Sequence, residues 1–228
     1  MRRQINVALL SCALALPALA NVIRYDFGDQ TTPTPGNWNN FSHLAEPIFN
    51  SIDETGAATG IAVRVTAPFW PGSNQNGTTT PGGAAAGLPG VATRDNLFGN
   101  LVDFGGNTAP QAQLTISGLN PALTYDFGFF GSRMGVGDNR ETSYTVTGAN
   151  NGVGLLNTAN NSSEMAFVNG IAPTANGTIT VDVTAGANNT SANRFYYLGV
   201  MTINPVPAPA GAAALALVGL GLAGRRRR

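Results

Sequence analysis

The sequence predicts an all-β domain, a β-sandwich of jelly-roll type, and three observations support this fold class. Roughly eight or nine short segments rich in apolar and β-branched residues follow one another, separated by turns of Gly, Asn, Pro and Thr. No run of long helices interrupts them. Thr and Val are abundant and Lys is absent, which favours strands over helices. A mixed α/β domain is the alternative fold.

Strands are expected where apolar and polar residues alternate, or where a short apolar run ends in turn formers. The strongest strand pattern lies at residues 123–130 (LTYDFGFF), after a turn at residues 118–121 (GLNP). The other expected strands are residues 22–27, 59–67, 112–117, 142–148, 164–168, 177–184 and 194–203.

Three further segments have different expected structures. Residues 41–52 fit a short helix that Asn39 or Ser42 would cap. Residues 68–90, rich in Gly, Pro, Thr and Asn, predict a long loop with almost no core residues, and loops of this length are usually functional or mobile. Residues 91–104 fit a helical turn followed by a short strand.

The first 20 residues have the order of a secretory signal peptide. Two arginines precede an apolar run, and Ala18 and Ala20 frame an A-x-A cleavage pattern, so the mature chain would begin at Asn21. Processing as a lipoprotein at Cys12 is the alternative. Because Cys12 is the only cysteine, the exported body would contain no thiol, no disulfide and no cysteine-based metal site.

The formal net charge of zero hides an acidic body. All 12 acidic residues lie between the two ends of the chain, whereas only six of the 12 basic residues do, all of them arginines. The body, residues 21–204, therefore has a formal charge of −6. Such a charge argues against nucleic acid as a partner and against electrostatic binding to an anionic membrane surface.

Two tryptophans and two arginines are candidates for ligand contact. Trp38 and Trp70 lie in Pro- and Gly-rich loops, where an exposed indole offers a flat apolar face and one donor to a sugar ring. Arg94, beside Asp95, and Arg133 lie next to Gly-rich loops, and an arginine fork can hold hydroxyls or carboxylates. The alternatives are an intramolecular Arg94–Asp95 pair and tryptophans that pack their own loops.

No catalytic constellation stands out in the sequence. His43, the only histidine, has Ser42 beside it and Glu46 three residues on, but no nucleophile-elbow pattern accompanies it. A single histidine also excludes a histidine-based metal site. A glycosidase or lyase would need two acids across a cleft. The candidate pairs are Asp26 with Asp29, Asp53 with Glu54, and Asp138 with Glu141.

Calcium is the one cofactor that the residues could accommodate. It accepts loop carboxylates and carbonyls without strict geometry. No EF-hand motif is present. The candidate ligands for a structural calcium ion are Asp26, Asp29, Asp53 and Asp138.

The end of the chain has three parts: a run of small and apolar residues at 210–224, preceded by a Pro motif and followed by arginines. The apolar run, about 15 residues, is shorter than the ~18–20 residues that span a bilayer comfortably. The arginines would stay on the cytoplasmic side, and the prolines keep the preceding backbone extended. The motif and basic residues are Val206, Pro207, Ala208, Pro209, Arg225, Arg226, Arg227 and Arg228.

This tail resembles the PEP-CTERM sorting signal of Gram-negative, exopolysaccharide-producing bacteria. The likeness lies in the order of a Pro-Glu-Pro motif, a hydrophobic run and a basic end, with Ala208 in the place of Glu. The resemblance implies transient contact with the inner membrane, recognition by an exosortase-type enzyme, and delivery to the cell surface or extracellular matrix. A plain C-terminal anchor helix is the alternative.

The body resembles galactose-binding-like and other carbohydrate-binding β-sandwich modules. The resemblance covers residues 22–203, fixes no binding residue, and implies polysaccharide as a partner. Its segments are LTISGLNPALTYDFGFFGSR, SYTVTG, NGTITVDVT and FYYLGVMTI.

The expected organisation is a signal peptide at residues 1–20, a β-sandwich at 21–204 and a sorting or anchoring segment with a hydrophobic helix at 205–228. The expected function is that of an exported, non-enzymatic protein of the cell surface or matrix that is associated with exopolysaccharide and binds carbohydrate. The alternative is a secreted glycosidase or polysaccharide lyase that uses carboxylates.

Overall fold

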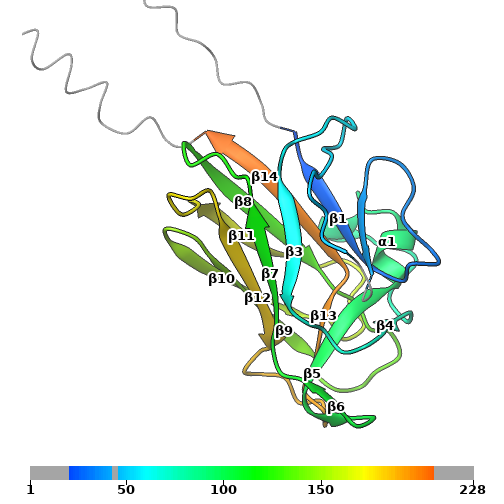
Figure 1. Ribbon diagram of the computed structural model, residues 1–228. Coiled ribbons are helices and arrows are strands. Elements are labelled where there is room, and N and C mark those ends of the chain that lie inside the picture. The colour runs from blue at the N-terminus through cyan, green and yellow to red at the C-terminus, as the bar shows by residue number, and fades with distance from the viewer. Residues whose placement is uncertain (1–20, 43–45, 208–228) are drawn as a thin grey trace, which may run out of the picture.

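The computed structural model describes residues 21–42 and 46–207, which form two five-stranded sheets and a smaller sheet at one end (Figure 1). The described residues include one short α-helix, α1 (Gly90–Arg94), and one turn of 3₁₀ helix, Gly83–Ala85. The prediction of an all-β sandwich is therefore confirmed.

The two large sheets are antiparallel apart from one pair of strands, β1 and β2, which run parallel. The first sheet has the order β11 (Ala166–Ile171), β8 (Leu123–Phe130), β14 (Val200–Pro207), β1 (Ile23–Gly28) and β2 (Asn39–Ser42). The second has the order β10 (Asn151–Asn157), β9 (Glu141–Thr147), β12 (Ile179–Ala185), β7 (Ala112–Ser117) and β3 (Ala62–Ala67).

The small sheet lies at the lower end of the sandwich in Figure 1, away from the end where β1 begins and β14 finishes. Its strands are β13 (Phe195–Leu198), β5 (Asn96–Phe104) and β4 (Ser73–Asn74), with β6 (Asn107–Ala109) paired to β5. The small sheet and the described termini thus lie at opposite ends of the domain.

The core lies between the two large sheets and is built from alternate residues of their strands. Leu114 and Ile116 of β7 are fully buried, whereas Thr115 between them is partly exposed. Across the core, the ring of Phe129 on β8 stacks on Tyr144 of β9 with centroids 4.5 Å apart. The alternation that predicts strands in the sequence is therefore the alternation that fills the core.

Several expected elements occur where the sequence places them. Four strands, β1, β7, β8 and β9, match the expected ranges within about one residue. The expected helical turn and strand at residues 91–104 are α1 and β5, although β5 is nine residues long rather than short.

The helix expected at residues 41–52 is not formed in its described part. Asn39 lies in β2, and its side-chain amide donates to the carbonyls of Arg24 and Ile52 while its oxygen accepts the Ile52 N–H. Ile48 makes an isolated bridge to Val63. Asn39 thus cross-links three segments instead of capping a helix. Residues 43–45, including His43, lie outside the described residues.

The single strand expected at residues 194–203 is two strands in two sheets. β13 joins the small sheet and β14 joins the sandwich, with Gly199 between them. A Cβ on Gly199 would lie 2.7 Å from the Asn96 side-chain oxygen, so a larger residue would require the Asn96 side chain to move. Residues 195–203 are almost all apolar, so the sequence pattern does not indicate that the chain changes sheet at Gly199.

The expected long loop at residues 68–90 is more ordered than its composition indicates. It contains β4 and the 3₁₀ turn, and it buries Phe69, Thr78 and Ala85. The sequence pattern does not predict β10, because Gly152 and Gly154 interrupt the alternation of apolar residues in this strand. Gly152 and Gly154 lie so close to Val168 of β11 that added Cβ atoms would approach it to 2.7 and 3.2 Å.

Only the first part of the tail motif is described. Val206 and Pro207 belong to β14 and pair with Thr124 and Leu123 of β8. The predicted signal peptide, with Ala18 and Ala20, and the tail from Ala208 lie outside the described residues. In residues 21–42 and 46–207, no helix is long and apolar enough to cross a membrane.

Gly99 provides a test of how the small sheet packs on the sandwich. A Cβ there would lie 2.1 Å from the Tyr196 ring, which is fully buried and donates its hydroxyl to the Ala109 carbonyl. We expect Gly99→Ala to lower the free energy of unfolding by about 1–3 kcal/mol in urea titrations followed by circular dichroism. Gly87→Ala, with open space around the added carbon, should change it by less than about 0.5 kcal/mol. Equal effects would contradict this packing.

Candidate functional site

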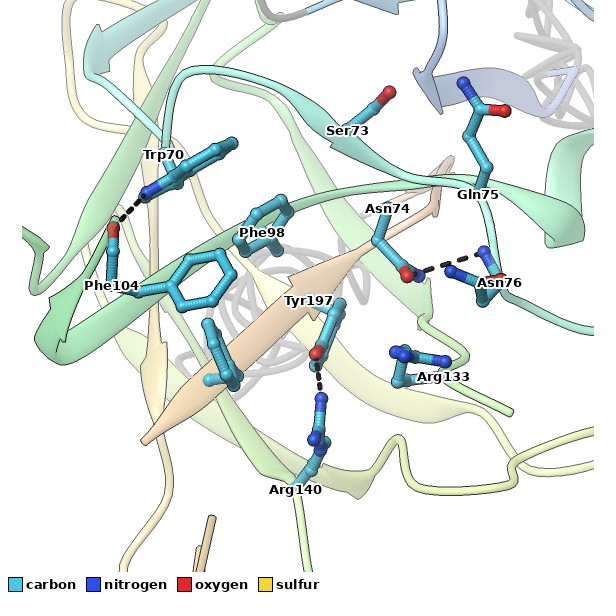
Figure 2. A pocket seen from close by; sticks show the side chains of 11 residues that line it. Trp70, Ser73, Asn74, Gln75, Asn76, Phe98, Phe104, Arg133, Arg140 and Tyr197 are labelled. Atoms are coloured by element: carbon cyan, nitrogen blue, oxygen red, sulfur yellow. Dashed lines mark hydrogen bonds between the residues drawn. The ribbon is translucent and has the colours of Figure 1, made fainter. Parts of the chain in front are cut away.

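A hollow of about 490 Å³ lies over the outer face of the small sheet. Figure 2 shows that rings cover one part of it and polar side chains surround the rest. We call it the aromatic hollow. Its five aromatic residues are Trp70, Phe98, Phe104, Phe195 and Tyr197, and its six polar residues are Ser73, Asn74, Gln75, Asn76, Arg133 and Arg140.

Strand alternation explains why the rings face the hollow. On β13, Tyr196 and Leu198 belong to the sandwich core, so Phe195 and Tyr197 point the other way. On β5, Phe98 is directly opposite Tyr197 in the ladder and shares its face. The small sheet therefore packs on the core through one face and lines the hollow with the other.

The rings hold one another in place. Trp70 stacks on Phe98 with centroids 4.9 Å apart, and its indole N–H donates to the Phe104 carbonyl at 3.1 Å. Phe104 meets Phe195 edge to face at 5.0 Å. Phe98 and Tyr197 are buried beneath, whereas Phe104 is 41% exposed. The outer rings offer apolar faces to a ligand on a fixed base.

Arg140 is fixed against these rings. Its guanidinium carbon lies 5.2 Å from the Phe195 centroid and 5.9 Å from that of Tyr197. It donates to the Asp138 carboxylate at 2.8 Å and to the Tyr197 hydroxyl. Burial opposes the charge of Arg140, but these contacts outweigh it and raise its pKa. Burial also raises the pKa of Tyr197, so the hydroxyl stays protonated.

Arg133 lies across the hollow from Trp70 and Phe104 (Figure 2). Its side chain donates to the Met134 carbonyl at 2.5 Å, and its backbone N–H donates to Thr158 at 2.8 Å. In the part of the chain that the structure describes, no carboxylate lies within ion-pair distance of Arg133. Among the described residues, Asp138 thus forms an ion pair with Arg140 and interacts with Arg133 only beyond ion-pair distance.

The structure brings together two of the five residues proposed from the sequence as ligand contacts. Trp70 and Arg133 both line the aromatic hollow. Trp38 is half-buried against a separate small cluster that includes Phe130, so its place matches the alternative of a tryptophan that packs its loop. Arg94 and Asp95 also lie elsewhere.

Sequence reasoning missed Phe98, Phe104, Phe195, Tyr197 and Arg140. For the segments that contain the rings, the sequence predicts a strand at 194–203 and a helical turn with a short strand at 91–104, and Arg140 follows a Gly-rich loop like that of Arg133. One signal was available: alternate aromatic residues in RFYYL place Phe195 and Tyr197 on one face and Tyr196 on the other. Large aromatic side chains on both faces of one strand indicate that each face packs against other residues.

A second polar cluster lies between β1 and α1, where Asp26 and Asp95 are 3% and 0% exposed. Asp26 accepts the Thr34 N–H at 3.2 Å, and Asp95 accepts the Asp29 N–H at 2.7 Å. The second oxygen of each has no hydrogen-bond partner among the described residues. The Arg94 guanidinium lies 3.9 Å from the Asp95 carboxylate, a loose ion pair of the kind that the alternative interpretation predicted. The same guanidinium donates a hydrogen bond to the Thr32 hydroxyl.

Burial dominates the titration of these two carboxyls. It raises the pKa of Asp26 to about 7; the hydrogen bond from Thr34 opposes this rise and the Asp95 charge adds to it. Burial also raises the pKa of Asp95, against the hydrogen bond from Asp29 and the charge of Arg94. The folded protein therefore favours the protonated form of both groups.

The other candidate acids have local structural partners. Asp53 accepts from Thr55 and Asn21, and these hydrogen bonds lower its pKa to about 2. Glu54 pairs with Arg24 at 2.7 Å, and Glu141 accepts from Asn188. Within residues 21–42 and 46–207, no three His, Cys, Asp or Glu side chains gather as metal ligands. The four proposed calcium ligands do not form one site.

Comparison with known proteins leaves the family open. No protein-family model matches the sequence, and no curated protein does. One similar solved structure is TmCBM61 in complex with β-1,4-galactotriose, at 12% identity over 50% of this chain and 66% of that chain, with a TM-score of 0.25. Another is the CBM22-1–GH10 part of Clostridium thermocellum xylanase 10B with xylohexaose, at 13% identity over 52% and 26%, with a TM-score of 0.28. Such values leave the function to be inferred from the aromatic hollow itself.

The buried acids predict an unusual dependence of stability on pH. Since the folded pKa of Asp26 lies above the ordinary value, its contribution to stability is full below about pH 4 and is lost as pH rises through about 7. We expect the free energy of unfolding to fall by roughly 2–4 kcal/mol over that range. Urea titrations at several pH values measure it. Asp26→Asn should flatten the curve, and parallel curves for the two proteins would contradict the assignment.

Proposed function

We propose that this chain is an exported, non-enzymatic protein that binds carbohydrate in the aromatic hollow. The observation that carries the proposal is the combination in one hollow of five packed aromatic rings with amide, hydroxyl and guanidinium groups. A sugar ring has an apolar face of C–H groups and a rim of hydroxyls. The first suits an aromatic face and the second needs hydrogen-bond partners, and the hollow offers both.

The fixed geometry of the rings adds to the affinity that such contacts can supply. The packed faces and the hydrogen bond from Trp70 restrict the rotamers of the rings before any ligand arrives. Little side-chain entropy is then lost on binding, and each lost rotamer costs about 0.5–1.5 kcal/mol. The half-buried Trp70 and the exposed Phe104 are the expected contacts for a sugar ring.

The location of the hollow suits a protein that is held by its C-terminal end. β14 finishes at the end of the sandwich opposite the small sheet (Figure 1). A tether that continues from Pro207 would therefore leave the hollow open to a polymer outside. This agrees with the proposed export, sorting by an exosortase-type enzyme, and a role in the extracellular matrix or exopolysaccharide.

A glycosidase or lyase has no specific observation in its favour. No described carboxylate lines the aromatic hollow. Two acids bind lining residues from outside the hollow: Asp138 accepts from Arg140, and Asp29 accepts from Gln75. Hydrolysis by two carboxylates requires both to flank the sugar bond, so the hollow fits binding better than cleavage.

Removal of the exposed rings tests carbohydrate binding. We expect Trp70→Ala and Phe104→Ala each to weaken binding to the best glycan of an array by at least about tenfold, because each removes a stacking face. Isothermal titration with the full-length protein gives the values. Phe167→Ala, which removes an equally apolar ring of 55% exposure on β11, should bind as the wild type does. Glycan binding that survives loss of both Trp70 and Phe104 would exclude this site.

The proposed route of export predicts two processed ends. In protein isolated from its native host, we expect mass spectrometry to find Asn21 as the first residue and to find no Arg225–Arg228 peptide. A chain that keeps its terminal arginines would argue for a plain anchor helix instead of sorting. A chain that begins with lipidated Cys12 would show lipoprotein processing.

A further inference from the structure

We propose that the aromatic hollow selects acidic saccharides and that Arg133 binds the carboxylate of a uronic acid residue. This inference rests on the proposed carbohydrate binding and adds the class of sugar. It starts from the distribution of charge between the hollow and the rest of the domain.

The hollow is a cationic site on an acidic domain. The described residues contain all 12 acidic side chains and six arginines. Two of these arginines line the hollow and none of the acids does. Arg140 forms an ion pair with Asp138, whereas no described carboxylate lies within ion-pair distance of Arg133. The positive charge of Arg133 therefore favours a ligand with negative charge.

The two arginines differ in what they can still bind. Arg140 is held by Asp138 and Tyr197 and covers two rings, so its charge is compensated and its position is fixed. Arg133 donates to one carbonyl, that of Met134, and has no carboxylate partner in the described chain. A guanidinium has five N–H donors in a planar fork. Most donors of Arg133 therefore remain for a ligand.

The layout of the hollow matches the two parts of a uronic acid. In Figure 2, the exposed rings lie on one side, and Arg133 lies on the other, next to Asn74 and Asn76. A pyranose ring that stacks on Trp70 or Phe104 can thus direct its C5 carboxylate toward Arg133. A carboxylate accepts two parallel N–H bonds from a guanidinium fork, a match that the neutral CH₂OH group of an ordinary hexose cannot make.

The test compares each acidic polymer with its neutral counterpart. The probes are polygalacturonate, polyglucuronate and alginate, each paired with the same polymer after reduction of its carboxyl groups to CH₂OH. We expect the full-length protein to bind at least one uronate polymer roughly tenfold or more tightly than its reduced form, as measured by isothermal titration. Hydrogen bonds to a charged group supply a difference of this size.

Two arginine variants assign the preference to the site. Arg133→Gln should abolish the difference between acidic and reduced polymer but leave binding to the reduced polymer within about twofold. Arg64→Gln makes the same charge change on the exposed side of β3, outside the aromatic hollow, and should keep the full preference. Thermal melts of both variants verify that the fold is intact.

The outcomes separate the two proposals. Equal binding of acidic and reduced polymers, or an unchanged preference in Arg133→Gln, overturns the acidic-sugar inference while carbohydrate binding stands. Selective binding of a sulfated galactan with no uronate preference also overturns it, because the charge recognised would not be a carboxylate. Failure to bind any glycan overturns the proposed function itself.

Discussion

Gly199 is the point where the chain passes from the small sheet to the sandwich, and both parts of the molecule depend on it. Its N–H donates to Phe130 on β8, and its carbonyl accepts from Phe27 on β1. A side chain there would meet the Asn96 amide. A larger residue at this position would therefore have to displace the buried Asn96 side chain, whose oxygen accepts the Ser132 N–H.

Because the chain changes sheet at Gly199, β13 contacts the core through one face and the aromatic hollow through the other. Tyr196 and Leu198 of β13 fill the core, while Phe195 and Tyr197 line the aromatic hollow. The Tyr144 hydroxyl, fully buried between the large sheets, donates to the Tyr197 carbonyl at 2.7 Å. The base of the hollow is thus hydrogen-bonded directly to the core of the sandwich. A binding surface built in this way loses little conformational freedom when a ligand arrives.

The sequence predicted a segment well where a single face of a strand is buried, and less well where both faces of a strand carry large side chains. Strict alternation located β7 because it has one covered face. The same alternation on β13 indicated a strand but could not show that its second face, with Phe195 and Tyr197, lines the aromatic hollow. Trp70 and Arg133 could be predicted because they lie in or beside Gly-rich loops, where a large or charged side chain has no evident place in the core. Phe98 and Tyr197 were not, because aromatic residues within strands usually belong to the core.

The cluster of Asp26 and Asp95 depends on pH and the aromatic hollow does not, because the first contains carboxyl groups and the second contains guanidinium groups. Burial raises the pKa of both Asp26 and Asp95, so the stability of their cluster depends on pH over the range where these carboxyls ionise. The aromatic hollow depends on guanidinium groups, and these remain charged at any pH that the fold tolerates. A uronate, whose carboxyl ionises near pH 4 like other carboxyls, would also stay charged above pH 5. Between pH 5 and 7 the stability of the fold therefore varies while the charges that bind the ligand do not. A loss of affinity in that range would have to come from unfolding, and the two effects can be separated by a melt at each pH.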